Sequence, residues 1–120
     1  MISGIDHVQI AMPPGEEQAA RDFYGGILGL EEIAKPPELA KRGGVWFQAA
    51  GFQIHLGVMP DFLPARKAHP GFRVRGLDAL QSVMESAGYT TTADSLIPGT
   101  RRFFSHDPFG NRLEFQEEET

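Results

Sequence analysis

The fold is decided by the stretch Asp107-Pro108-Phe109-Gly110-Asn111-Arg112-Leu113-Glu114-Phe115. Proline presets φ and glycine accepts a positive φ, so the first five residues are typical of a tight turn. After the turn the residues alternate, with Leu113 and Phe115 on one side and Glu114 on the other. The stretch therefore predicts a turn that leads into a half-buried strand, with a carboxylate facing away from its apolar side.

A matching strand lies about half a chain earlier, which indicates an internal repeat. His55 stands where Glu114 stands in the later strand, and 114 − 55 = 59. His7 and His69 form a second matched pair, and 69 − 7 = 62. Both offsets are close to half of the 120 residues. The repeat predicts two related units that face each other and bring together three imidazoles and one carboxylate, a donor set that suits a divalent metal.

Each half is predicted to be strand–helix–strand–strand–strand. An apolar stripe with helical spacing marks one helix in each half. Gly25-Gly26 weakens the end of the first helix, and Gly88 is a good stop for the second. The first half has a strand at 5–12, a helix at 16–28 and strands at 30–34, 44–50 and 52–58; the second has a strand at 70–75, a helix at 77–87 and strands at 89–93, 101–106 and 112–117.

Length and composition limit the domain organisation. A chain of 120 residues fits one domain that buries roughly two-thirds of its unfolded surface. A half of about 60 residues would be marginal alone by the same scaling, so we expect the halves to fold together or to pair across a dimer. We expect module 1 at about 1–58, a proline-containing linker at 59–68 and module 2 at about 69–120.

Charge and cysteine content exclude several classes of function. The formal net charge is −5 and no block of Lys or Arg occurs, which argues against nucleic-acid and anionic-membrane partners. The absence of cysteine excludes disulfides, thiolate nucleophiles and cysteine-ligated zinc. No secretory signal is recognisable and no apolar run approaches the ~20 residues of a membrane span, so we expect a cytoplasmic protein.

Stretches that cover nearly the whole chain resemble the vicinal oxygen chelate superfamily, which includes glyoxalase I, fosfomycin-resistance thiol transferases, extradiol dioxygenases and bleomycin-binding proteins. The matching stretches are Asp6 to Ile10, Ala20 to Tyr24 with Leu28 to Glu31, Val74 to Leu80 and, most specifically, Asp107 to Phe115. The resemblance implies an α+β fold in which two βαβββ modules form a half-open barrel around the site.

The resemblance also implies a metal site. Carried over, the ligands are His7 and His69 from the first strands of the modules and Glu114 from a last strand, with His55 as the fourth position. A set of this kind suits Fe(II), Mn(II), Ni(II) or Zn(II). If His55 does not ligate, it is the best general acid or base, so His55 and Glu114 are also the catalytic candidates.

Each of these roles has a simpler alternative. His7 could be a hydrogen-bonded strand histidine, and Glu114 a solvated carboxylate. His106, just before the turn, is interpreted as incidental.

Four further residues are candidates for substrate binding. Arg101 and Arg102 begin a strand, so only one can face inward, where it would clamp a carboxylate, phosphonate or enolate oxygen. Trp46 and Phe47 also point to opposite faces, so one is expected in the core and the other against the substrate. Solvated charge remains the simpler interpretation of the two arginines.

Two functions from different classes follow. The first is a small metal-dependent enzyme of the glyoxalase, lyase or dioxygenase kind, acting on a small molecule that chelates the metal through two oxygens. The second is a metal-free protein that sequesters a small aromatic or cationic ligand, as bleomycin-resistance proteins do. In many short relatives the modules pair between chains, so the resemblance implies a homodimer.

Overall fold

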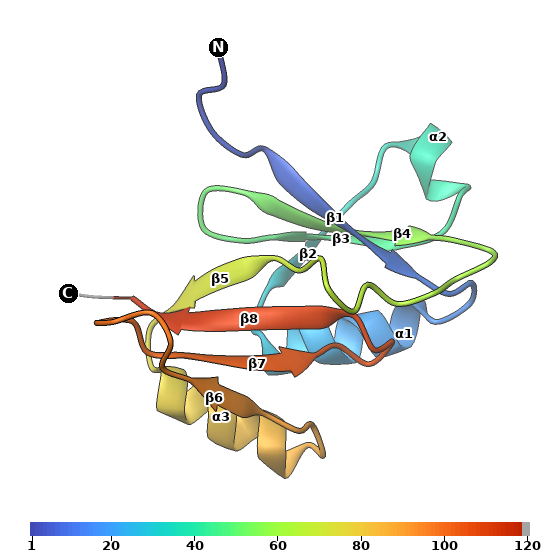
Figure 1. Cartoon of the computed structure of the whole chain (residues 1–120). Coiled ribbons are helices and arrows are strands. Elements are labelled where there is room, and N and C mark those ends of the chain that lie inside the picture. The colour runs from blue at the N-terminus through green and yellow to red at the C-terminus, as the bar shows by residue number, and fades with distance from the viewer. Residues whose placement is uncertain (119–120) are drawn as a thin grey trace. The chain divides into compact units, whose positions relative to one another are not determined.

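A computed structural model of the chain describes residues 1–118 (Figure 1). The chain divides into two compact units, one ending at Pro64 and the other beginning at Ala65. Within residues 1–118, no helix is long and apolar enough to cross a membrane.

Unit 1 is a four-stranded sheet with its helical segments inserted between strands. The strand order is β1-β4-β3-β2, in which β1 is parallel to β4 and the other neighbours are antiparallel. The elements are β1 (His7–Met12), α1 (Glu17–Ala20), η1 (Arg21–Ile27), β2 (Glu31–Ile33), α2 (Pro37–Ala40), β3 (Val45–Gln48) and β4 (Gln53–Val58).

Unit 2 repeats this topology. The strand order is β5-β8-β7-β6, again with the first strand parallel to the last. The elements are β5 (Gly71–Val74), α3 (Leu77–Ser86), β6 (Thr92–Asp94), β7 (Arg102–His106) and β8 (Arg112–Glu117), and Figure 1 shows α3 beside its sheet. The predicted pair of βαβββ modules is therefore confirmed.

The first helix differs from its prediction. The segment from Glu17 is α-helical for one turn and then continues as the π-helix η1, in which the amide of Leu28 donates to the Phe23 carbonyl at 2.9 Å. A π-turn holds one residue more than an α-turn. The adjacent Phe23 and Tyr24 are both fully buried, and the Tyr24 ring lies 5.8 Å from that of Phe47 on β3. The short α2, with Pro37 at its start, was not predicted.

Each sheet has one apolar and one polar face, as strand alternation requires. In unit 1 the buried side includes Met12, Phe47 and Leu56, and in unit 2 it includes Phe103 and Phe115. Burial of each such side chain contributes roughly 1.5–3 kcal/mol. The opposite, polar faces carry the candidate functional residues. Packing of the apolar face fixes which side chains of each strand point to the polar face.

The turn before β8 is fixed by hydrogen bonds to its own side chains. Asp107 is fully buried, and its Oδ1 accepts from the amides of Phe109 and Asn111 at 2.9 and 3.0 Å. Gly110 has φ 90°, the positive value that the sequence requires there. The Asn111 side chain in turn accepts from the amide of Ala65 at 3.0 Å, which ties the start of β8 to the start of unit 2.

Candidate functional site

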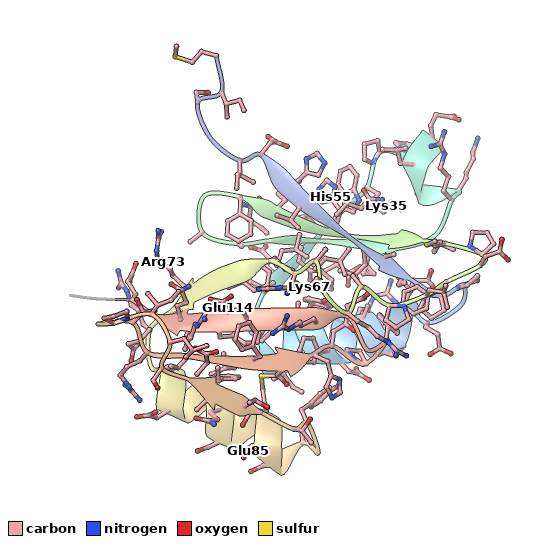
Figure 2. The ribbon with its side chains drawn as sticks, in the orientation of Figure 1. Lys35, His55, Lys67, Arg73, Glu85 and Glu114 are labelled. Atoms are coloured by element: carbon pink, nitrogen blue, oxygen red, sulfur yellow. The ribbon has the colours of Figure 1, made fainter. Side chains whose placement is uncertain are left out.

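The four predicted metal ligands form two pairs, one in each unit. His7 on β1 and His55 on β4 come from adjacent strands of unit 1, and their rings are 4.3 Å apart. His69, two residues before β5, lies 2.9 Å from Glu114 on β8 in unit 2. In each unit the pair thus lies where the first strand runs parallel to the last, with His69 just before β5, and Figure 2 marks His55 and Glu114.

In unit 1 the centre of the polar face is a stack of three rings. His55 lies between Trp46, at 3.7 Å and an interplanar angle of 4°, and His7, at 4.3 Å and 13°. Trp46 is the residue directly opposite His55 across the β3–β4 ladder. The stack leaves His55 only 5 % exposed.

A chain of amides fixes the orientation of the His55 ring. The Gln48 side-chain nitrogen donates to the carbonyls of Ala49 and Phe52 at 2.8 and 3.0 Å, so its oxygen faces the other way and accepts from Gln53 at 3.3 Å. The Gln53 oxygen then faces Nε2 of His55 at 2.9 Å. Because an amide oxygen only accepts, Nε2 carries the proton and Nδ1 holds the lone pair.

The same surroundings keep His55 neutral. Burial lowers the pKa of His55 below 6.5, and the nearby His7 and Lys35 add to the lowering, while Asp6 opposes it. A neutral imidazole at neutral pH can accept a proton or bind a cation.

His7 is held differently from His55. Its Nδ1 lies 2.9 Å from the Asp6 carboxylate, and its side chain is 44 % exposed. A metal binds imidazole in the plane of the ring, at about 2.0–2.1 Å from nitrogen. Two rings stacked face to face cannot both aim at one ion, so His7 must turn if it ligates beside His55. The locked His55 is thereby favoured as a proton carrier over a ligand.

In unit 2 both ring nitrogens of His69 lie at hydrogen-bonding distance from acceptor oxygens. Its Nδ1 lies 2.8 Å from the Lys67 carbonyl oxygen, and its Nε2 lies 2.9 Å from Oε1 of Glu114. The Lys67 carbonyl oxygen and the Glu114 carboxylate are both hydrogen-bond acceptors, so each lies where a ring N–H can donate to it. A cation that replaced the Nε2 proton would leave Nδ1 donating to a carbonyl, the usual arrangement of a metal-bound histidine. The pair therefore fits a metal.

Glu114 is an ionised and nearly buried carboxylate. Its side chain is 7 % exposed, and it accepts from Gln116 at 2.6 Å, from His69 and from Arg102 at 3.2 Å. Burial acts to raise the pKa of Glu114, but these hydrogen bonds outweigh it and bring the pKa below 4.5. Arg102 also pairs with Asp94 at 3.1 Å, so its guanidinium already joins two carboxylates.

The remaining predicted residues are divided between the faces. Trp46 lies in the ring stack and Phe47 is buried in the core. Arg102 lies on the face of Glu114, whereas Arg101 precedes β7 and pairs with Asp78 and Glu117.

Among residues 1–118, no group of three or more His, Asp or Glu side chains gathers closely enough to hold a metal ion.

Sequence reasoning missed Gln48, Gln53 and Arg112. The signal for all three was the two-residue period. Gln53 and Arg112 each stand two residues before a predicted site residue, on the same face of the strand. Gln48 faces Gln53 across the hairpin.

Comparisons with known proteins agree with this topology. Residues 4–115 match the family model of the Glyoxalase/Bleomycin resistance protein/Dioxygenase superfamily. A glyoxalase family protein from Bacillus anthracis is 48 % identical, with 99 % of this chain and 98 % of that chain covered and a TM-score of 0.94. A search of curated proteins found no match.

Two more distant structures share the fold alone. The fosfomycin resistance protein FosX from Listeria monocytogenes is 18 % identical over 99 % of this chain and 96 % of that chain, with a TM-score of 0.78. The antibiotic binding protein TnmS3 from Streptomyces sp. CB03234 is 20 % identical over 98 % of both chains, with a TM-score of 0.75. By its family match and its close relative, the chain belongs to the glyoxalase/bleomycin resistance protein/dioxygenase superfamily.

Proposed function

We propose that the protein is a small metal-dependent enzyme, a lyase or dioxygenase, in which His7, His69 and Glu114 hold one divalent cation. The observation that carries the proposal is the hydrogen bonding of His69, whose Nδ1 faces a carbonyl while Nε2 faces a carboxylate. The proton between Nε2 of His69 and the Glu114 carboxylate lies between two atoms that can both ligate a metal, so a cation can take its place.

His7 supplies a matching donor from unit 1. Its Nδ1 faces the Asp6 carboxylate, so Nε2 is the nitrogen left for a metal. The proposed set is two neutral imidazoles and one carboxylate, which suits Fe(II), Mn(II), Ni(II) or Zn(II). Its donors come from both units, so the two modules would act as one domain, in one chain or across a homodimer.

The chemistry assigned to His55 is proton transfer. It is neutral, nearly buried and held by Gln53 with its Nδ1 lone pair available. When bound, a divalent cation would stabilise negative charge that develops on two neighbouring substrate oxygens. A small substrate with two such oxygens would place its proton-bearing carbon within reach of a base of this kind.

Metal titration tests the proposal. Chelator-treated protein is titrated calorimetrically with each of the four ions, beside His7→Ala and the matched control His106→Ala. The proposal expects affinity tighter than ~0.1 mM for at least one ion, lost in His7→Ala and kept in His106→Ala. Wild type with no such affinity, or His7→Ala binding equally well, would contradict it.

The ring stack favours a second candidate, a metal-free protein that sequesters a small aromatic or cationic ligand. Trp46, His55 and the half-exposed His7 form a parallel stack, and the outer face of an end ring offers a flat surface on which an aromatic or cationic ligand could stack. Trp46 is the only tryptophan, so quenching of its fluorescence by such a ligand in chelated protein would support this candidate.

A further inference from the structure

The polar face of unit 2 carries two arginines that contact the same ring. The guanidinium carbon of Arg112 lies 4.2 Å from the centre of the Phe104 ring, and that of Arg102 lies 4.9 Å from it. The His69 ring meets the same ring edge-on at 5.4 Å. Phe104 is also directly opposite Glu114 across the β7–β8 ladder. Arg112 therefore lies beside the His69–Glu114 pair.

The two arginines differ in what they bind. Arg102 is 14 % exposed and pairs with both Asp94 and Glu114. Arg112 is half-buried, and its guanidinium makes no ion pair and no hydrogen bond with any other of residues 1–118. It lies over the Phe104 ring, and its charge is near enough to Asp94 to help lower the pKa of that carboxyl. Its five N–H donors are arranged as a fork that matches the oxygens of a carboxylate or phosphonate.

The equivalent position in unit 1 shows that this is not a requirement of the fold. Gln53 occupies that position, and its amide is engaged by Gln48 and His55. The backbone amides at this position donate in both units, that of Gln53 to the Asp6 carbonyl at 3.0 Å and that of Arg112 to the Ala65 carbonyl at 2.8 Å. The side chain is therefore free to serve a different purpose.

We propose that Arg112 binds an anionic oxygen group of the substrate, a carboxylate or phosphonate, and so selects anionic over neutral substrates. This inference deepens the proposed function and rests on it, since it takes the face of His69 and Glu114 to be where substrate binds. It transfers to Arg112 the anion-binding role that the sequence assigned to Arg101 or Arg102.

The test uses chelator-treated full-length protein, so that binding of the anion to a metal plays no part. Lactate, methylphosphonate and the neutral lactamide are titrated at constant ionic strength while NMR follows the Arg112 Nε–H and the Phe104 ring. We expect at least one anion to bind about tenfold more tightly than lactamide, with both signals shifting. Lactate and methylphosphonate separate the carboxylate from the phosphonate form of the proposal.

Variants separate Arg112 from a general charge effect. Arg112→Gln should remove the preference for anions, and Arg112→Lys should keep part of it because the charge remains without the fork. Arg73→Gln removes the same charge from an exposed position of β5 and should leave the preference unchanged. Equal binding of lactamide and both anions to wild type, or unaltered preference in Arg112→Gln, overturns the inference. Equal loss in Arg73→Gln also overturns it.

The outcome is independent of the metal. If wild type binds no divalent ion yet Arg112 still selects anions, the enzyme proposal fails and the anion site stands. If wild type binds a divalent ion but does not select anions, the anion site fails and the metal proposal stands.

Discussion

At equivalent positions the two units carry opposite chemistry. In unit 1 the pair across the central ladder is Trp46 and His55, and the imidazole is neutral. In unit 2 it is Phe104 and Glu114, and the carboxylate is ionised. The shared backbone fixes where a side chain stands, and the residues around it decide whether it offers a neutral nitrogen or a charged oxygen.

The largest effect is expected for Glu114→Gln, which removes the charged donor of unit 2. Loss of a residue that hydrogen-bonds to a metal ligand costs about 10–100-fold in metal affinity. We therefore expect loss of Glu114, a direct ligand in the proposed site, to cost more than about 100-fold. Leu113 and Phe115 still pack, and Asp94 still pairs with Arg102, so the loss of stability should be only roughly 1–3 kcal/mol. Calorimetry measures the affinity and urea unfolding the stability.

A carboxylate in the same strand provides the control. Glu117 accepts from the amides of Gly76 and Leu77 at the start of α3, so Glu117→Gln should lower stability and leave metal affinity unchanged. An insoluble Glu114→Gln protein, or one with wild-type affinity, would point to a structural role for Glu114.

Mixing two variants that each lack a metal ligand tests whether the units pair between chains. His7→Ala lacks the unit 1 donor of the proposed site, and Glu114→Gln lacks one of its two unit 2 donors. In a two-fold homodimer with interchain sites, random mixing restores about a quarter of the sites, because half of the dimers are mixed and each has one intact site. Equilibrium metal binding by the refolded mixture measures this fraction. No recovery, together with a monomer mass by light scattering, would refute interchain assembly.

Protonation of His55 should destabilise unit 1. Its pKa is below 6.5 in the folded state, so the unfolded chain binds the proton more readily, and stability should fall as pH drops below 6.5. Trp46→Leu exposes the ring and should raise the pKa of His55 toward 6.5, whereas Trp46→Phe should change it less. An NMR titration of the His55 ring measures the pKa, and a value in wild type at or above 6.5 would be incompatible with this account.

Glu114 should respond in the acid range. Its pKa lies below 4.5, so its stabilising contribution is complete above the unfolded pKa and is lost as pH falls through the lower folded value. In Glu114→Gln this part of the acid dependence should disappear from the urea unfolding curves. A profile unchanged by the substitution would show that the ionised carboxylate does not contribute.

The smallest effect is expected for Gln53→Leu, which breaks the amide chain without removing a charge. In wild type the ¹⁵N shifts of His55 should show a proton on Nε2, and in the variant the proton should be shared between both nitrogens. Gln9→Leu, on the same face of β1, is the matched control and should leave the shifts unchanged. A proton on Nδ1 in wild type would disprove the proposed orientation.

Local patterns were sufficient to predict the strands, the turn before β8 and the polar faces. The two-residue period put His55 and Glu114 opposite their apolar neighbours, and that period is a property of the strand itself. The turn was predictable because Pro108 and Gly110 restrict only their own backbone angles.

Other features depend on partners distant in sequence. Alternation alone left Trp46 and Phe47 interchangeable, since both are aromatic, and packing of η1 decides that Phe47 is buried. Whether Arg102 is available to bind a substrate depends on the β6–β7 register, which brings Asp94 opposite it. No local sequence pattern predicts that register. The π-helical turns of η1 contain two adjacent buried aromatic residues, Phe23 and Tyr24, and the apolar spacing of the sequence did not distinguish them from α-helical turns.

The most direct test of the central claim is a crystal structure of protein loaded with the tightest-binding of the four ions, with anomalous scattering recorded at the edge of that metal. We expect one anomalous peak per site at about 2.0–2.2 Å from nitrogens of His7 and His69 and from an oxygen of Glu114. A structure without such a peak, or with the ion held by residues of one unit only, would contradict the account.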